Sequence, residues 1–106
     1  MIAQAVAKIS AHEAQSAANG FLLDHLPDRY LAVEPRLDAL LQAWRVKVVL
    51  TYPFIGSVGE VGEIIISAIS EDVLSHTPLT EMRERARQHY EQHREAIQTA
   101  FSQAGN

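Results

Sequence analysis

The chain of 106 residues contains no cysteine, so it can form no disulfide bond and has no thiolate for catalysis or metal binding. It also lacks a long hydrophobic run, since none approaches the ~18 consecutive apolar residues that a membrane-spanning helix needs. Near its start, Lys8, His12 and Glu13 interrupt the apolar positions, which argues against an export signal. From these absences we expect a cytoplasmic protein with no membrane contact.

Basic residues are scarce relative to acidic ones. The chain has 9 lysines and arginines against 13 aspartates and glutamates, a formal net charge of −4. A polyanionic nucleic-acid backbone attracts a basic surface, so nucleic acid is not an expected partner. The hydrophobic fraction of 47% and the charged fraction of 21% are ordinary for a folded protein, and the length suits one domain over residues 1–106.

The clearest pattern lies between Trp44 and Leu74 and predicts antiparallel strands. Apolar side chains alternate with more polar ones over Trp44–Tyr52, as on a strand with one buried face. A β-branched run over Ile64–Ile69 predicts a second strand. After the polar turn Ser70–Asp72, Val73 and Leu74 predict a short return strand.

A helix is predicted on each side of these strands. Apolar residues recur at helical spacing from Ile2 to about Leu26, where Pro27 ends the pattern. Thr77 and Pro78 predict the start of a second helix, a capping hydroxyl followed by proline, which runs to about Gln103. Its apolar stripe consists of Leu79, Met82, Ala86, Tyr90, His93, Ile97 and Phe101.

The segment between the first helix and Trp44 allows two interpretations. Arg29–Val33 suits a short edge strand that is stopped by Glu34 and Pro35, after which Leu37, Leu40, Leu41 and Trp44 suit a short helix. Alternatively, the main strand begins before Trp44.

The predicted fold is α+β: an antiparallel meander of three or four strands with both helices on one face. The predicted core residues are Trp44, Val46, Val48, Leu50, Ile64, Ile66, Met82, Ala86, Tyr90 and Ile97.

The glycine-punctuated segment from Pro53 to Glu63 is predicted to be a loop between two strands. Its glycines match neither the dinucleotide-binding fingerprint nor the P-loop, and they suit bends or a bulge. The segment carries much apolar surface for a connection, and Val49, Ile65 and Ile69 are expected on an open sheet face. The predicted contact residues are therefore Phe54, Ile55, Val58, Val61, Ile65 and Ile69, and they suggest a protein partner or a homodimer.

His89 and His93 are one helical turn apart and suit a metal site if His76, His25 or a carboxylate completes it. Zincin proteases carry glutamate directly after the first histidine, where this chain has Tyr90. The alternative is that His93 lies buried with a hydrogen-bond partner. The same helix carries Arg83, Arg85, Arg87 and Arg94, which suit either an anion contact or a solvated face paired with glutamates.

Two further functional interpretations concern small molecules and catalysis. A pocket between the sheet and the helices would involve Tyr52, Phe54, Tyr90 and His93. Ser57 has no adjacent base or acid in the sequence, so we assign no catalytic residue, and no motif indicates a cofactor.

The strand that begins at Trp44, the segment Gly62–Ala68, the turn after it and Val73–Leu74 resemble the strand-turn-strand of PepSY-type domains. Glu71 and Asp72 stand where that family has its turn glycine. The last helix, around Tyr90–Glu95, also resembles small uncharacterised bacterial proteins of similar length. The PepSY resemblance implies a small α+β domain that inhibits or binds without catalysis. The main functional hypothesis is accordingly a non-enzymatic interaction or regulatory module, such as the accessory member of a two-protein system, as antitoxins are for toxins.

Overall fold

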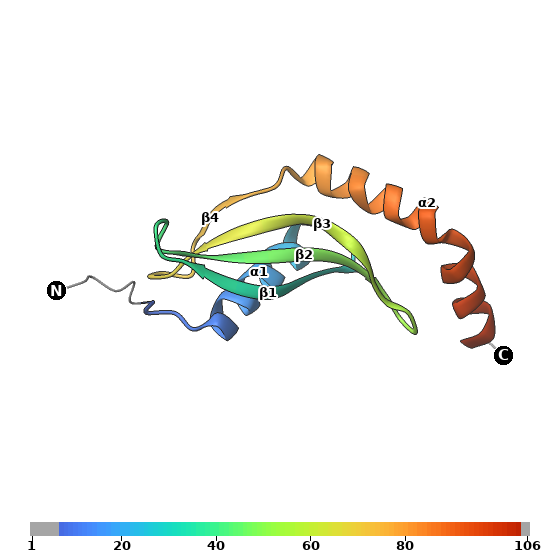
Figure 1. Cartoon of the computed structure of the whole chain (residues 1–106), viewed down its shortest axis with the longest axis horizontal. Coiled ribbons are helices and arrows are strands. Elements are labelled where there is room, and N and C mark those ends of the chain that lie inside the picture. The colour runs from blue at the N-terminus through green and yellow to red at the C-terminus, as the bar shows by residue number, and fades with distance from the viewer. Residues whose placement is uncertain (1–6, 105–106) are drawn as a thin grey trace.

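A computed structural model describes residues 7–104, and its central element is an antiparallel sheet of four strands (Figure 1). The strands follow the chain order β1-β2-β3-β4, so each pairs with its neighbour in sequence. A helix precedes the sheet and a longer helix follows it, which confirms the predicted α+β fold. The elements are α1 (Ala11–His25), β1 (Tyr30–Asp38), β2 (Ala43–Tyr52), β3 (Gly56–Ser67), β4 (Val73–His76) and α2 (Leu79–Ala104).

Helix α1 begins later than predicted because Ser10 and Glu13 form a capping box at its start. The Glu13 backbone N–H donates to the Ser10 hydroxyl over 3.1 Å, and the Ser10 N–H donates to the Glu13 carboxylate over 3.0 Å. Ile9 lies before the helix, and its backbone carbonyl accepts a hydrogen bond from the Trp44 indole N–H. The prediction that the helix already includes Ile9 is therefore wrong. Ile2 itself lies outside the described residues.

Strand β1 continues to Asp38, and the short helix predicted over Leu37–Trp44 does not form. Leucines at helical spacing favoured that helix, but the chain from Tyr30 onward pairs with β2 in an antiparallel ladder. The register shifts between Val33 and Arg36, which is a bulge. The ladder resumes after it, so the edge strand predicted over Arg29–Val33 is present but does not stop at Pro35, and the main strand β2 begins at Ala43, one residue before Trp44.

The glycine segment is mostly strand, so the long loop predicted over Pro53–Glu63 is wrong. Only Pro53–Ile55 connect β2 to β3. The expected bulges are present, because the register with β2 shifts twice and leaves Val58 and Val61 as extra residues of β3. Each extra residue shifts the alternation of side chains by one, and both valines belong to the core instead of an exposed loop.

The core lies on one face of the sheet, where both helices contribute to a single cluster. Trp44 and Tyr90 are only half-buried, each an aromatic ring that also carries a polar group. The other predicted core residues are buried: Val46, Val48, Leu50, Ile64, Ile66, Met82, Ala86 and Ile97.

Helix α2 is attached to the sheet by Thr77, which does not act as the predicted helix cap. The Thr77 hydroxyl accepts a hydrogen bond from the backbone N–H of Glu63 over 3.0 Å, and the Thr77 N–H donates to the Glu63 carbonyl. The helix then extends past the sheet beside the β2–β3 hairpin, where Phe101 contacts Tyr52 and Phe54 (Figure 1). No helix within residues 7–104 has the length and apolar character to cross a membrane.

Candidate interaction surface

Within the residues that it describes, the structure does not bring a third ligand to His89 and His93, and one nitrogen of each ring lies near a backbone carbonyl. His89 lies over Gly59, and its Nε2 is 2.8 Å from the Glu60 carbonyl oxygen. His93 Nδ1 is 2.9 Å from the His89 carbonyl, one turn back in the same helix. Across residues 7–104, no three His, Cys, Asp or Glu side chains lie together as a metal would require.

The two histidines that were expected to complete that site lie around Phe21. The His25 ring stacks on the Phe21 ring with a centroid distance of 4.2 Å. The His76 ring, from β4, lies with its centroid 4.7 Å from that of Phe21. His25 and His76 therefore contribute to the packing of α1 and β4.

The open face of the sheet is charged, which corrects the expectation of an apolar contact surface there. Val49 and Ile65 are each only 8% exposed, and Ile65 lies opposite Arg45 in the neighbouring strand. Long charged side chains cover apolar surface with their methylene stems. Four ion pairs cross this face: Arg45–Asp38 (2.8 Å), Arg45–Glu63 (2.9 Å), Lys47–Glu34 (3.3 Å) and Lys47–Glu60 (3.6 Å).

The four residues of the predicted ligand pocket do not come together. Tyr52 and Tyr90 line a hollow with arginines from two elements, and their rings are 6.3 Å apart. Phe54 lies at the hairpin tip, where 74% of it is exposed and its ring contacts Phe101 edge-on. His93 is exposed on α2.

A group of exposed apolar residues at one end of the sheet combines Ile69, a predicted contact residue, with leucines whose spacing predicted a helix. The β1–β2 turn and the β3–β4 turn share one end of the sheet, since the Ala68 N–H donates to the Gln42 carbonyl over 3.0 Å. We call the exposed apolar residues at this end the leucine end: Leu37 (39% exposed), Leu40 (98%), Leu41 (50%) and Ile69 (45%).

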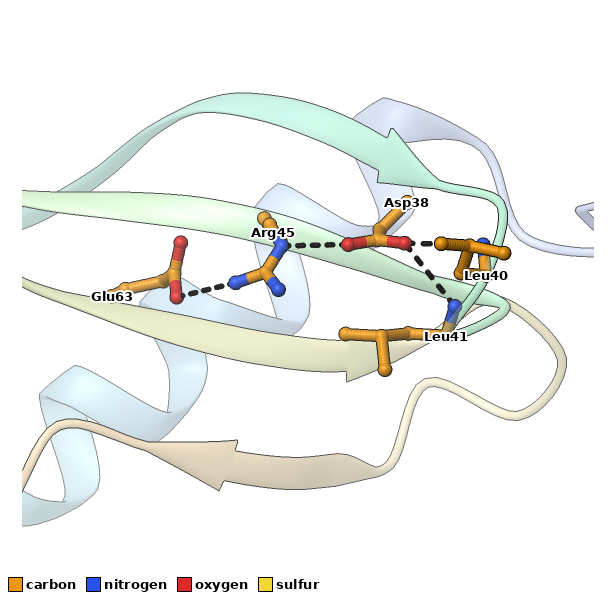
Figure 2. A network of polar contacts seen from close by, with 5 residues as sticks. All are labelled: Asp38, Leu40, Leu41, Arg45 and Glu63. Atoms are coloured by element: carbon orange, nitrogen blue, oxygen red, sulfur yellow. Dashed lines mark hydrogen bonds and ion pairs between the residues drawn. The ribbon is translucent and has the colours of Figure 1, made fainter.

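A polar network holds the β1–β2 turn in place, as Figure 2 shows. One carboxylate oxygen of Asp38 accepts from the backbone N–H groups of Leu40 and Leu41 over 3.1 and 3.2 Å. The other accepts from Nε of Arg45, and Arg45 donates in turn to Glu63 of β3. The turn that carries Leu40 is therefore tied to three strands by side-chain contacts.

This network predicts a specific pH dependence. The Arg45 guanidinium and the N–H groups of Leu41 and Leu40 hold the pKa of Asp38 below its ordinary value of 3.8. A lowered pKa contributes stability above the unfolded-state pKa, and that contribution is lost as the pH falls through the folded-state value. We therefore expect Asp38→Asn to be less stable than wild type at neutral pH, with the difference narrowing below pH 3.8.

Urea unfolding of both proteins at a series of pH values measures this difference. Glu13 and Glu84 also have lowered pKa values, from their bonds to Ser10 and Arg87, but they are present in both proteins and cancel. A stability difference that stays constant down to pH ~2 would show that Asp38 does not act through its charge.

The sheet edges are poorly suited to strand addition by a partner. The outer edge of β1 is covered by α1, because the Asn19 side chain accepts from the Ala32 N–H over 2.9 Å and Gln15 donates to the Ala32 carbonyl over 3.0 Å. Strand β4 at the other edge has four residues. Covered and short edges disfavour edge-to-edge pairing, so the leucine end is the stronger candidate for a contact.

A comparison with known protein families, with curated proteins and with solved structures finds no match to this chain. The resemblance to PepSY-type domains accordingly stays a prediction.

Proposed function

We propose that this chain is a non-enzymatic interaction module, an accessory protein that binds a partner protein through the leucine end. The observation that carries the proposal is the position of Leu40, whose side chain is 98% exposed on a turn that Asp38 holds in place. Exposed apolar side chains gathered at one site are characteristic of contact surfaces, and a prearranged anchor loses little conformational entropy on binding.

The surroundings of Leu40 indicate the chemistry of the partner. A hollow of about 420 Å³ beside it is lined by Arg36, Leu37, Asp38, Ala39, Leu40 and Arg45. Within residues 7–104, Arg36 forms no ion pair, whereas Arg45 is paired on both sides. A partner with an apolar pocket for Leu40 and a carboxylate on its rim for Arg36 would match this surface.

A second copy of the chain is a less suitable occupant of the leucine end. Stable interfaces bury on the order of 1,600 Å² in total, and four side chains at one end of a narrow sheet supply a small part of that area. The covered edge of β1 also removes the simplest way for two copies to extend one sheet. The homodimer suggested by the sequence is therefore the alternative to a partner protein, and the experiment below distinguishes the two.

The test is affinity capture of the tagged full-length chain from its native cells, with wild type and Leu40→Ser in parallel. We expect wild type to retain one protein in stoichiometric amount. Leu40→Ser should retain at least about tenfold less of it, since loss of an anchoring side chain costs roughly 2 kcal/mol or more. The substitution should leave folding unchanged, because Leu40 contacts little else in the free chain.

Leu23→Ser is the matched control, since Leu23 is 75% exposed on α1 near the opposite end of the sheet. The proposal requires this variant to retain the partner as wild type does. Equal capture by wild type and Leu40→Ser, or no stoichiometric protein with either, would contradict it. The purified chain could also sediment as a dimer that the Leu40→Ser substitution dissociates. That result would mean that the leucine end binds a second copy of the chain and not a different protein.

A further inference from the structure

A second surface, at the other end of the sheet, combines arginines with tyrosines. The turn after α1, the start of β1, the end of β2 and the first half of α2 line an open hollow of about 280 Å³. We call it the Arg–Tyr hollow. It is lined by Arg29, Tyr30, Tyr52, Arg83, Arg87 and Tyr90, with Leu50 and Ala86 as its apolar surface and Pro27 and Asp28 at its border.

The hollow carries positive charge that the chain only partly neutralises. Arg29 and Arg83 form no ion pair within residues 7–104, whereas Arg87 pairs with Glu84 over 2.6 Å. Asp28 is the one carboxylate among the lining residues. Two unpaired guanidinium groups therefore face the same space, beside a third that has an internal partner.

Arg29 is held in place by its backbone and by aromatic rings. Its guanidinium carbon lies 5.3 Å from the centre of the Tyr52 ring and 5.7 Å from that of Phe101. Its φ of +119° is a strained conformation for a residue other than glycine, and its carbonyl accepts from the Thr51 N–H over 2.8 Å. Strained backbone of this kind recurs at ligand-binding sites, where the surrounding structure maintains it.

The tyrosines supply neutral hydrogen-bond donors and flat apolar walls. Burial raises the pKa of Tyr30, and the Arg83 charge acts in the opposite direction. Burial also raises the pKa of Tyr52. Both phenols stay protonated at neutral pH, so they can donate to an anion and do not repel it.

We propose that the Arg–Tyr hollow binds a small organic phosphate, a phosphate monoester carried on a single ring or a group of similar size. Guanidinium groups bind phosphate oxygens in bidentate fashion, and the dianion matches the two unpaired arginines. Tyr30, Tyr52 and Leu50 would contact the ring. The volume of about 280 Å³ is just below the ~300–1,000 Å³ typical of ligand pockets, which favours a small molecule over a polymer.

The inference is independent of the interaction proposed for the leucine end. The hollow lies where β1 begins and β2 ends, whereas the leucine end lies where β1 ends and β2 begins. Leu40→Ser should therefore bind phosphate esters as wild type does, even though it is expected to lose its partner.

The experiment is a calorimetric titration of the full chain with phenyl phosphate, repeated with inorganic phosphate. We expect phenyl phosphate to bind with one site per chain and more tightly than inorganic phosphate. Amide chemical shifts should change at Tyr30, Leu50 and Ala86. Absence of binding, equal affinity for the two probes, or shift changes confined to the ion pairs of the open sheet face would each overturn the proposal.

Arg83→Gln and Arg85→Gln form a matched pair for the charge. Both arginines are exposed on α2, but Arg83 lines the hollow, whereas Arg85 pairs with Glu81 outside it. We expect Arg83→Gln to weaken phenyl phosphate binding about tenfold or more and Arg85→Gln to leave it unchanged. If both variants weakened phenyl phosphate binding equally, the binding would depend only on the overall charge of the protein, and the proposed site would be overturned.

Discussion

Met82→Ala is expected to lower the free energy of unfolding by about 2–5 kcal/mol, the largest effect of a single substitution proposed for this protein. Met82 is fully buried and lies where the first turn of α2 packs against β3. Alanine would remove most of the buried side chain and leave a cavity that the neighbouring backbone at Gly62 cannot fill. Urea unfolding monitored by circular dichroism measures the change.

The control for this substitution is Leu23→Ala, which removes a side chain of similar size from an exposed position on α1. It should change stability by no more than about 0.5 kcal/mol. If the two variants were equally stable, α2 would not be packed on the sheet through Met82, and the cluster that joins the two helices would be wrong.

Gly62→Ala is expected to destabilise the protein by about 1–3 kcal/mol, because it adds a methyl group where no space exists. A Cβ at Gly62 would lie 2.9 Å from both Cβ and Oγ1 of Thr77 and 3.1 Å from Cγ of Met82. Thr77 cannot move aside freely, since its hydroxyl accepts the Glu63 N–H and its own N–H donates to the Glu63 carbonyl. Relief of the overlap would separate the start of α2 from β3.

Gly20→Ala supplies the same chemical change with the opposite expected sign. Gly20 lies inside α1, and a Cβ there would meet no atom within 4 Å. Alanine favours the helix over glycine by about 0.5–1 kcal/mol, so this variant should be more stable than wild type. Destabilisation by Gly20→Ala, or an unaffected Gly62→Ala, would contradict the packing described here; thermal unfolding of the two variants side by side distinguishes the cases.

Strands and long helices were predictable because their patterns are local. Alternation over Trp44–Tyr52 reports a strand with one buried face whatever the neighbouring elements are, and the stripe from Met82 to Ile97 reports a helix in the same way. The start of α1 was also local, since Ser10 and Glu13 form a capping box that the sequence contains. The Ser-x-x-Glu pattern by itself predicts the observed start of α1 at Ala11.

The candidate surfaces were not predictable in the same way, because they depend on pairing between distant residues. The spacing of Leu40 and Leu41 suits a helix, but both residues lie in a turn that the Asp38 carboxylate closes and that the pairing of β1 with β2 requires. The Arg–Tyr hollow joins residues from the turn after α1, from β2 and from α2, which are separated by up to about sixty positions along the chain.

By itself, the sequence determined the two helices, the antiparallel meander and most of the core, since periodicity and burial act over a few residues. Tertiary structure alone decided which side chains stay exposed. The two bulges of β3 placed Val58 and Val61 in the core and turned Glu60 toward Lys47 on the open face. A shift of one residue inverts the faces of a strand, and the register that sets this shift exists only once the neighbouring strand is in place.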